Sequence, residues 1–127
     1  MRILWLVLLL LLPAVADEGA LAAEWAQLRQ VKGHFQGGEW VAAVDAWAGR
    51  KHHVLSLLGD LVGKPGTPEE RVRQLLGKPD RDNGGPFVQT PPGSTVLVYE
   101  WRGMHDFLYF ICVNGRVTHS GWWMAGE

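Results

Sequence analysis

The chain has 127 residues, of which 47% are hydrophobic and 20% are charged, a composition typical of one folded domain rather than of a disordered segment. Its formal net charge of −1 at pH 7 argues against a nucleic-acid-binding protein, because neutralising phosphates needs an excess or a stripe of basic residues. With a single cysteine, Cys112, the chain cannot build an intramolecular disulfide framework or a metal site made of several cysteines.

The first residues have the pattern of a targeting segment. A basic start is followed by an apolar run from Ile3 to Leu12, and Ala14-Val15-Ala16 has the small-x-small pattern that signal peptidase accepts. The apolar stretch is shorter than the roughly 20 residues that a bilayer-spanning helix needs. We therefore expect residues 1–16 to be a signal peptide, or a membrane anchor through residues 3–16 if it is not cleaved. Either form predicts an exported protein of the periplasm, the envelope or the extracellular space.

Residues 17–63 show the spacing of amphipathic helices. Apolar side chains recur at i, i+4 and i+7 in two stretches, and a third stretch carries a denser stripe that ends before Gly63. We expect these stripes to face the core and the adjacent Lys51, His52 and His53 to form a polar helix edge. The three stripes are Leu21, Trp25 and Leu28; Trp40, Val44 and Trp47; and Val54, Leu57, Leu58 and Leu61.

A capped helix is predicted at the start of the region 64–127. Thr67 is a natural N-cap, Pro68 suits the first helical position, and Glu70 completes a capping box with Thr67. Gly77 is suited to a left-handed cap, and Pro79 prevents the helix from continuing. The segment 81–94 that follows is rich in glycine and proline and is interpreted as a long loop with at most one short edge strand.

Three strands are predicted to follow this loop, over residues 95–101, 107–113 and 116–124. Asn114-Gly115 is a strong hairpin signal, because both central residues of a type I′ turn need a positive φ. The turn pairs Cys112 with Val117 and Phe110 with His119, and the preceding turn pairs Tyr99 with Leu108 and Leu97 with Phe110. The predicted fold is α+β: N-terminal helices packed on one face of a three- to four-stranded antiparallel β-meander, with 17–63 and 64–127 in one compact domain.

This register predicts the two faces of the sheet. The face expected under the helices is apolar apart from His119, and it holds Leu97, Tyr99, Trp101, Leu108, Phe110, Cys112, Val117, His119 and Trp123. The other face mixes aromatic and polar residues, as expected of a half-solvated or partner-binding surface. It holds Val96, Val98, Glu100, Phe107, Tyr109, Ile111, Arg116, Thr118, Ser120 and Trp122.

The stretch from Gly66 to Asp80, with its capped helix and Leu-Leu-Gly-Lys-Pro-Asp exit, resembles the SmpA/OmlA (BamE-like) family. The strands Val98–Trp101 and Phe110–Val117 resemble those that follow this helix in the family. The resemblance implies a small α+β envelope or secreted protein with a β-lactamase-inhibitor-like fold, similar to an outer membrane protein assembly factor. Such proteins bind other proteins and have no catalytic site. The lipid-attachment cysteine of the bacterial pattern is missing here.

The leading functional hypothesis is therefore a non-enzymatic protein-binding or envelope scaffold module that uses the second face of the sheet. No cofactor, metal or nucleic acid is predicted. One alternative is a small-ligand site on the same aromatic face, roofed by the 81–94 loop. A second alternative is a thiol enzyme using Cys112 with His119, which share a predicted face. The candidate partner- or ligand-binding residues are Phe107, Tyr109, Trp122, Arg116 and Phe87.

Two histidine motifs receive structural interpretations. His52 and His53 are adjacent and point about 100° apart on a helix, so they do not form the i, i+4 pair that a metal site needs. His105 and Asp106 could orient a base, but they fall in a predicted hairpin turn, where histidines are usually exposed to solvent.

Overall fold

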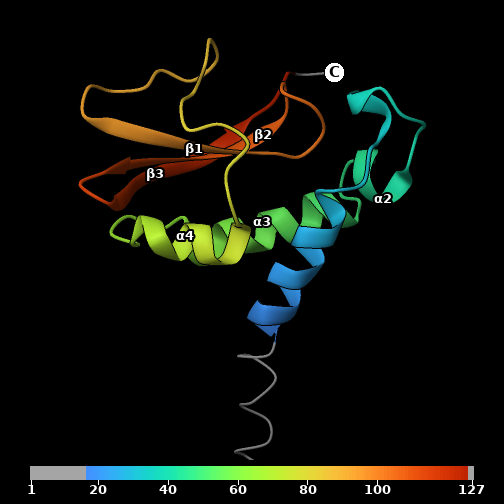
Figure 1. Cartoon of the computed structure of the whole chain (residues 1–127), viewed down its shortest axis with the longest axis horizontal. Helices are drawn as coiled ribbons and strands as arrows, with labels where there is room; N and C mark the ends of the chain where they lie inside the picture. The colour runs from blue at the N-terminus through green and yellow to red at the C-terminus, as the bar shows by residue number, and fades with distance from the viewer. Residues whose placement is uncertain (1–16, 126–127) are drawn as a thin grey trace, which may run out of the picture.

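The computed structural model describes residues 17–125, and it places a layer of helices beneath a three-stranded antiparallel sheet (Figure 1). The strands follow one another in the order β1-β2-β3, so the predicted α+β meander is confirmed. The expected signal segment, residues 1–16, lies outside the described residues. The elements are a helix over residues 17–28 (the N-terminal helix), η1 (His34–Gln36), α2 (Ala42–Asp45), α3 (Arg50–Val62), α4 (Glu69–Leu76), β1 (Ser94–Glu100), β2 (Phe107–Val113) and β3 (Arg116–Trp123).

Helix α3 is the main helical support of the sheet, but its buried stripe differs from the predicted one. Val54, Leu55, Leu58 and Val62 are buried, whereas Leu57 and Leu61 of the predicted stripe are exposed. Both stripes satisfy the helical period, because the apolar residues of α3 cover more than one face. The choice between them depends on where the sheet and the N-terminal helix lie, which periodicity alone does not reveal.

The predicted helix around residues 40–47 is a single turn, α2, and only Val44 of its expected apolar stripe is buried. Trp40 and Trp47 are exposed, so their prediction as core residues is wrong. A local bonding pattern explains the short helix. The buried Asp45 carboxylate accepts the backbone N–H groups of His34 (2.9 Å) and Val41 (2.8 Å), which fixes the preceding loop instead of lengthening the helix.

Helix α4 begins later than its sequence predicts. Pro68 is the N-cap residue, and the Thr67 hydroxyl donates to the Lys64 carbonyl (2.7 Å) rather than to the helix, so the predicted capping box does not form. The segment before α4 is instead held by β3, where the Val117 N–H donates to the Thr67 carbonyl (2.8 Å). The predicted exit is confirmed in part: Gly77 ends the helix with φ 80° and ψ −161°, a region that glycine alone adopts readily and not the left-handed helical one.

The β2–β3 hairpin forms as predicted at its turn. Asn114 (φ 52°) and Gly115 (φ 75°) both have positive φ, and Cys112 pairs with Val117. The β1–β2 register is also confirmed, with Leu97 opposite Phe110 and Tyr99 opposite Leu108.

A β-bulge overturns the predicted register beyond the turn. Pairing shifts between Ile111 and Cys112, so Thr118 is an extra residue in β3, and its hydroxyl donates to the Ile111 carbonyl (3.1 Å). Phe110 consequently pairs with Ser120 instead of the predicted His119, and Leu108 pairs with Trp122. Every later side chain of β3 changes face, because side chains in a strand alternate with a period of two.

Both faces of the sheet carry buried side chains. Against the helices lies the main core, which includes Trp25, Tyr99, Trp101 and Phe110, and Trp122 packs against it. On the other face Val96, Val98 and Phe107 form a second, smaller buried cluster, which is covered by Phe87 and Val88 of the loop that precedes β1. The second face is thus partly closed by the chain itself.

Candidate functional site

The second face of the sheet carries a group of aromatic and aliphatic side chains that are only partly covered. We call this group the aromatic face, and it consists of Phe87, Tyr109, Ile111 and Trp123 around the buried Phe107. The ring centroids of Phe87 and Trp123 are 5.6 Å apart, those of Phe87 and Phe107 6.2 Å, and those of Phe107 and Tyr109 6.4 Å. These separations are those of interacting aromatic rings, so the face is one continuous patch.

Strand β2 and the loop before β1 place the residues of this patch through their local backbone geometry. The alternation of β2 directs Phe107, Tyr109 and Ile111 to the same side of the sheet. The loop contributes Phe87 through a tight turn, in which the backbone N–H of Val88 donates to the Gly84 carbonyl (3.2 Å). An added Cβ at Gly84 would lie 1.8 Å from the Val88 carbonyl oxygen, so only glycine allows this turn.

A charged residue borders the aromatic face. The Arg81 guanidinium lies over the Phe107 ring, with 4.8 Å between its Cζ atom and the ring centroid, and its Nη1 atom is 3.8 Å from Glu100 Oε2. Burial, and next the nearby Asp80 carboxylate, raises the pKa of Glu100, while Arg81 opposes this shift. Arg81 is therefore held by a ring and a carboxylate together, and its ion pair with Glu100 borders the patch.

The structure brings together three of the five predicted binding residues. Phe87, Phe107 and Tyr109 lie on the second face, with Phe107 fully buried and the other two half-buried. Trp122 does not lie there, because the bulge at Thr118 turns it toward the helices.

Arg116, the fifth predicted residue, lies at the hairpin end of β3. Its Nη1 atom donates to the Gly66 carbonyl (2.8 Å), which ties it to the segment before α4 rather than to the aromatic face. Trp123 is the residue that the sequence reasoning missed. Predicting its face requires a sequence signal for the bulge. Thr118 gives none, because threonine is a common residue in regular strands.

The predicted pairing of Cys112 with His119 is wrong. Cys112 lies opposite Val117 in the main core, whereas the bulge places His119 opposite Ile111 and exposed to solvent. Burial is the main cause that raises the pKa of the Cys112 thiol to about 11, so the thiol is protonated at neutral pH. This environment is that of a structural cysteine.

We accordingly expect the Cys112 thiol of the native protein to react with an aromatic disulfide reagent at least about 100-fold more slowly at pH 7 than after unfolding in guanidinium. The reactive thiolate fraction falls tenfold for each unit by which the pKa rises, and burial slows access of the reagent further. The denatured chain provides the control for a competent thiol. A fast reaction of the folded chain at pH 7 would contradict this assignment.

The predicted polar edge of α3 is only partly exposed. Lys51 is 2% exposed, with its Nζ atom 5.8 Å from the centroid of the Trp25 ring, and burial lowers its pKa. His52 lies among aromatic rings, 4.6 Å from Trp47, 4.5 Å from Trp101 and 5.1 Å from Trp122 between centroids, and burial lowers its pKa too. These residues support the packing of the helical layer.

His105 and Asp106 do not act as a pair. Asp106 is buried and accepts hydrogen bonds from Arg102 Nε (2.8 Å) and from the Ala125 N–H (2.9 Å). His105 is exposed and lies in a T-shaped arrangement with the Phe87 ring, with 6.0 Å between centroids. The Asp106 carboxylate therefore stabilises the β1–β2 turn, and the His105 imidazole borders the aromatic face.

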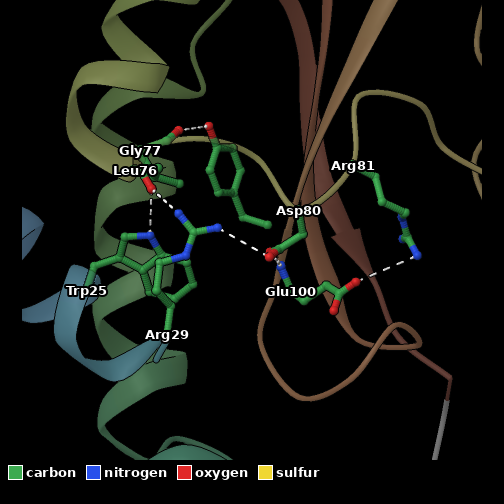
Figure 2. A network of polar contacts seen from close by, with 8 residues as sticks. Trp25, Arg29, Leu76, Gly77, Asp80, Arg81 and Glu100 are labelled. Carbon is green, nitrogen blue, oxygen red and sulfur yellow. Dashed lines mark hydrogen bonds and ion pairs between the residues drawn. The ribbon is translucent and has the colours of Figure 1, made fainter. Parts of the chain in front are cut away.

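A network of polar contacts joins the N-terminal helix to α4 and β1 (Figure 2). The Trp25 indole N–H (2.9 Å) and Arg29 Nη1 (2.8 Å) both donate to the Leu76 carbonyl, and Arg29 Nη2 is 3.3 Å from Asp80 Oδ1. The second Asp80 oxygen accepts the Glu100 N–H (2.7 Å). Because these groups bond to one another across three elements, we interpret the network as the attachment of the N-terminal helix.

Within residues 17–125, no helix is long and apolar enough to cross a membrane, and no three metal-binding side chains are grouped closely enough to hold an ion. No family model, curated protein or solved structure matches the chain. The resemblance to the SmpA/OmlA family stays a prediction from the sequence.

Proposed function

We propose that the chain is a non-enzymatic protein-binding module, exported or membrane-associated, whose contact surface is the aromatic face. The observation that carries this proposal is the half-buried group of Tyr109, Ile111 and Trp123, which remains accessible beside the covered part of the second face. Aromatic side chains with one covered and one open side are the type that supplies most of the binding energy at protein interfaces.

The loop before β1 favours a protein partner over a small ligand on this face. Phe87 and Val88 already pack on Val96, Val98 and Phe107, so the chain's own side chains occupy the place where a roofed ligand would lie. The remaining accessible strip lies along β2 and β3, and a partner's apolar side chains can cover such a strip without opening the loop. The export part of the proposal depends on the signal-like pattern of residues 1–16 and on the family resemblance.

A site-specific photocrosslinking experiment tests the proposal. A benzophenone amino acid is placed at Tyr109 or Trp123 in the full-length chain, and at Leu61 as a control, because Leu61 is 48% exposed on the opposite, helical layer. Irradiation of living cells that naturally express the chain is expected to give the same protein adduct from positions 109 and 123, in the membrane or extracellular fraction, and not from position 61. Adducts that are equal at all three positions, or absent from 109 and 123, would contradict the proposal.

A further inference from the structure

The outer edge of β1 is covered by the chain itself. The Asp80 N–H donates to the Val98 carbonyl (2.8 Å), the Val98 N–H donates to the Arg81 carbonyl (2.9 Å), and the Val96 N–H donates to the Asp82 carbonyl (3.3 Å). An uncovered edge strand offers unpaired backbone groups to another chain, and this segment removes that possibility along β1.

The outer edge of β3 is covered only at its first residues. The Gly66 N–H donates to the Val117 carbonyl (2.7 Å), and the Glu69 N–H donates to the Gly115 carbonyl (2.8 Å). From Thr118 to Trp123, no backbone hydrogen bond arrives from outside the sheet within the described part of the chain. Within residues 17–125, the hydrogen bond that joins this stretch to a residue outside the sheet comes from a side chain: the Ser120 hydroxyl donates to the Gly63 carbonyl (2.9 Å).

The backbone groups that this edge offers follow from the alternation of an antiparallel pair. Val117 directs its N–H and C=O away from β2, as its bonds to Gly66 and Thr67 show. The bulge at Thr118 shifts the alternation by one residue, so Ser120 and Trp122 are the next residues that direct these groups outward.

The open half of the edge also lacks the residues that usually protect edge strands. Natural edges carry lysine, other charges or proline, which oppose pairing with another strand. Residues 118–125 contain no Lys, Arg, Asp, Glu or Pro. Thr118, His119 and Ser120 are exposed, and the next four residues are half-buried. The bulge limits the free edge to a short stretch but does not close it.

We infer that this stretch pairs with the same stretch of a second copy of the chain, strand against antiparallel strand. A two-fold axis at Gly121 would place Ser120 of each copy opposite Trp122 of the other, so outward groups meet outward groups. Because the stretch is uncharged, two copies meet without like-charge repulsion, whereas a charged peptide would find no complementary side chain in it.

The pairing would also extend the aromatic face. Tyr109 lies across Gly121, since an added Cβ at Gly121 would be 2.9 Å from the Tyr109 hydroxyl oxygen. Tyr109 and Trp123 of each copy would therefore flank the two-fold axis, and the two sheets would present one continuous aromatic surface. The dimer would enlarge the contact surface on which the proposed function rests, but the test for a dimer needs no binding partner.

The test compares full-length wild type with Ser120→Pro and Ser120→Ala, each purified in the form that the cell produces. Both variants lose the hydroxyl bond to Gly63, but only proline removes the outward N–H, which takes no part in pairing with β2. Sedimentation equilibrium in a density-matched detergent, over a range of concentrations up to about 200 μM, is expected to give twice the chain mass for wild type and Ser120→Ala. Circular dichroism and thermal unfolding establish whether Ser120→Pro is folded.

Amide hydrogen exchange of the wild type gives a second measurement that does not depend on the proline variant. The Ser120 and Trp122 amides are expected to exchange at least about 10-fold more slowly at the highest than at the lowest concentration, with Val98 as an unchanged control because its N–H is bonded within the chain. A monomeric wild type, a dimer that persists in folded Ser120→Pro, or concentration-independent exchange would overturn the inference. If a partner's extended segment binds there instead, wild type alone stays monomeric, while photocrosslinking at Tyr109 still succeeds.

Discussion

Replacing Trp25 by alanine is expected to lower the free energy of unfolding by about 3–5 kcal/mol, the usual cost of removing a large buried aromatic side chain. Trp25 is fully buried in the main core, and its indole N–H donates to the Leu76 carbonyl at the end of α4. Alanine would leave a cavity between the N-terminal helix and α4. It would also remove the ring that lies near the buried Lys51 Nζ atom. Urea unfolding followed by circular dichroism measures the change.

Trp25→Phe is the matched control for this experiment. Phenylalanine keeps most of the ring but loses the indole N–H, and the Leu76 carbonyl still accepts a hydrogen bond from Arg29 Nη1. The expected loss is therefore smaller, about 1–2 kcal/mol, corresponding to one hydrogen bond and some packing. Equal losses for the two variants would show that the hydrogen bond, and not the packing, holds the N-terminal helix.

The features that the sequence predicted correctly are those with a local cause. The Asn114-Gly115 turn forms because both residues adopt positive φ, and the turn fixes the adjacent pair of Cys112 with Val117. Trp25 is buried on its helix as the periodicity predicts. In each case the information lies within a few residues, so the interpretation did not depend on distant parts of the chain.

The features that were wrong have causes that lie far away in the sequence. The buried stripe of α3 includes Leu55 and Val62 rather than Leu57 and Leu61, because the positions of the sheet and of the N-terminal helix select it. The absence of the capping box at Thr67 has the same kind of cause, since the backbone of that segment is already bonded to β3 some fifty residues later. Periodicity and capping rules describe an isolated helix and do not include such competitors.

The candidate site depended on one residue. The bulge at Thr118 exchanges the faces of Trp122 and Trp123, so Trp123 and not the predicted Trp122 lies on the second face of the sheet. The same insertion separates His119 from Cys112. A single unpaired residue thus determines which tryptophan lies on the aromatic face and whether Cys112 and His119 share a face, because strand geometry converts a shift of one residue into a change of face.

The second large effect is expected at Arg102, which joins the β1–β2 turn to the segment around α2. Its Nε atom donates to Asp106 Oδ2 (2.8 Å), its Nη1 atom donates to the Asp45 carbonyl (3.0 Å), and its guanidinium lies between the rings of Trp101 (4.2 Å) and Phe35 (4.7 Å). Arg102→Met is expected to cost about 3–5 kcal/mol, because it leaves the Asp106 carboxylate, 5% exposed, without its cation.

A double-mutant cycle with Asp106→Leu separates the ion pair from the stacking. If the unpaired carboxylate causes most of the loss, Arg102→Met combined with Asp106→Leu is less destabilising than the sum of the two single changes by more than about 1 kcal/mol. Arg102→Lys keeps the charge but not the planar group between the two rings. The decrease in the free energy of unfolding that it causes therefore measures the stacking and the hydrogen bond to the Asp45 carbonyl. Additive single effects would contradict a buried ion pair, and the attachment of residues 33–49 to the sheet would then depend mainly on the aromatic sandwich.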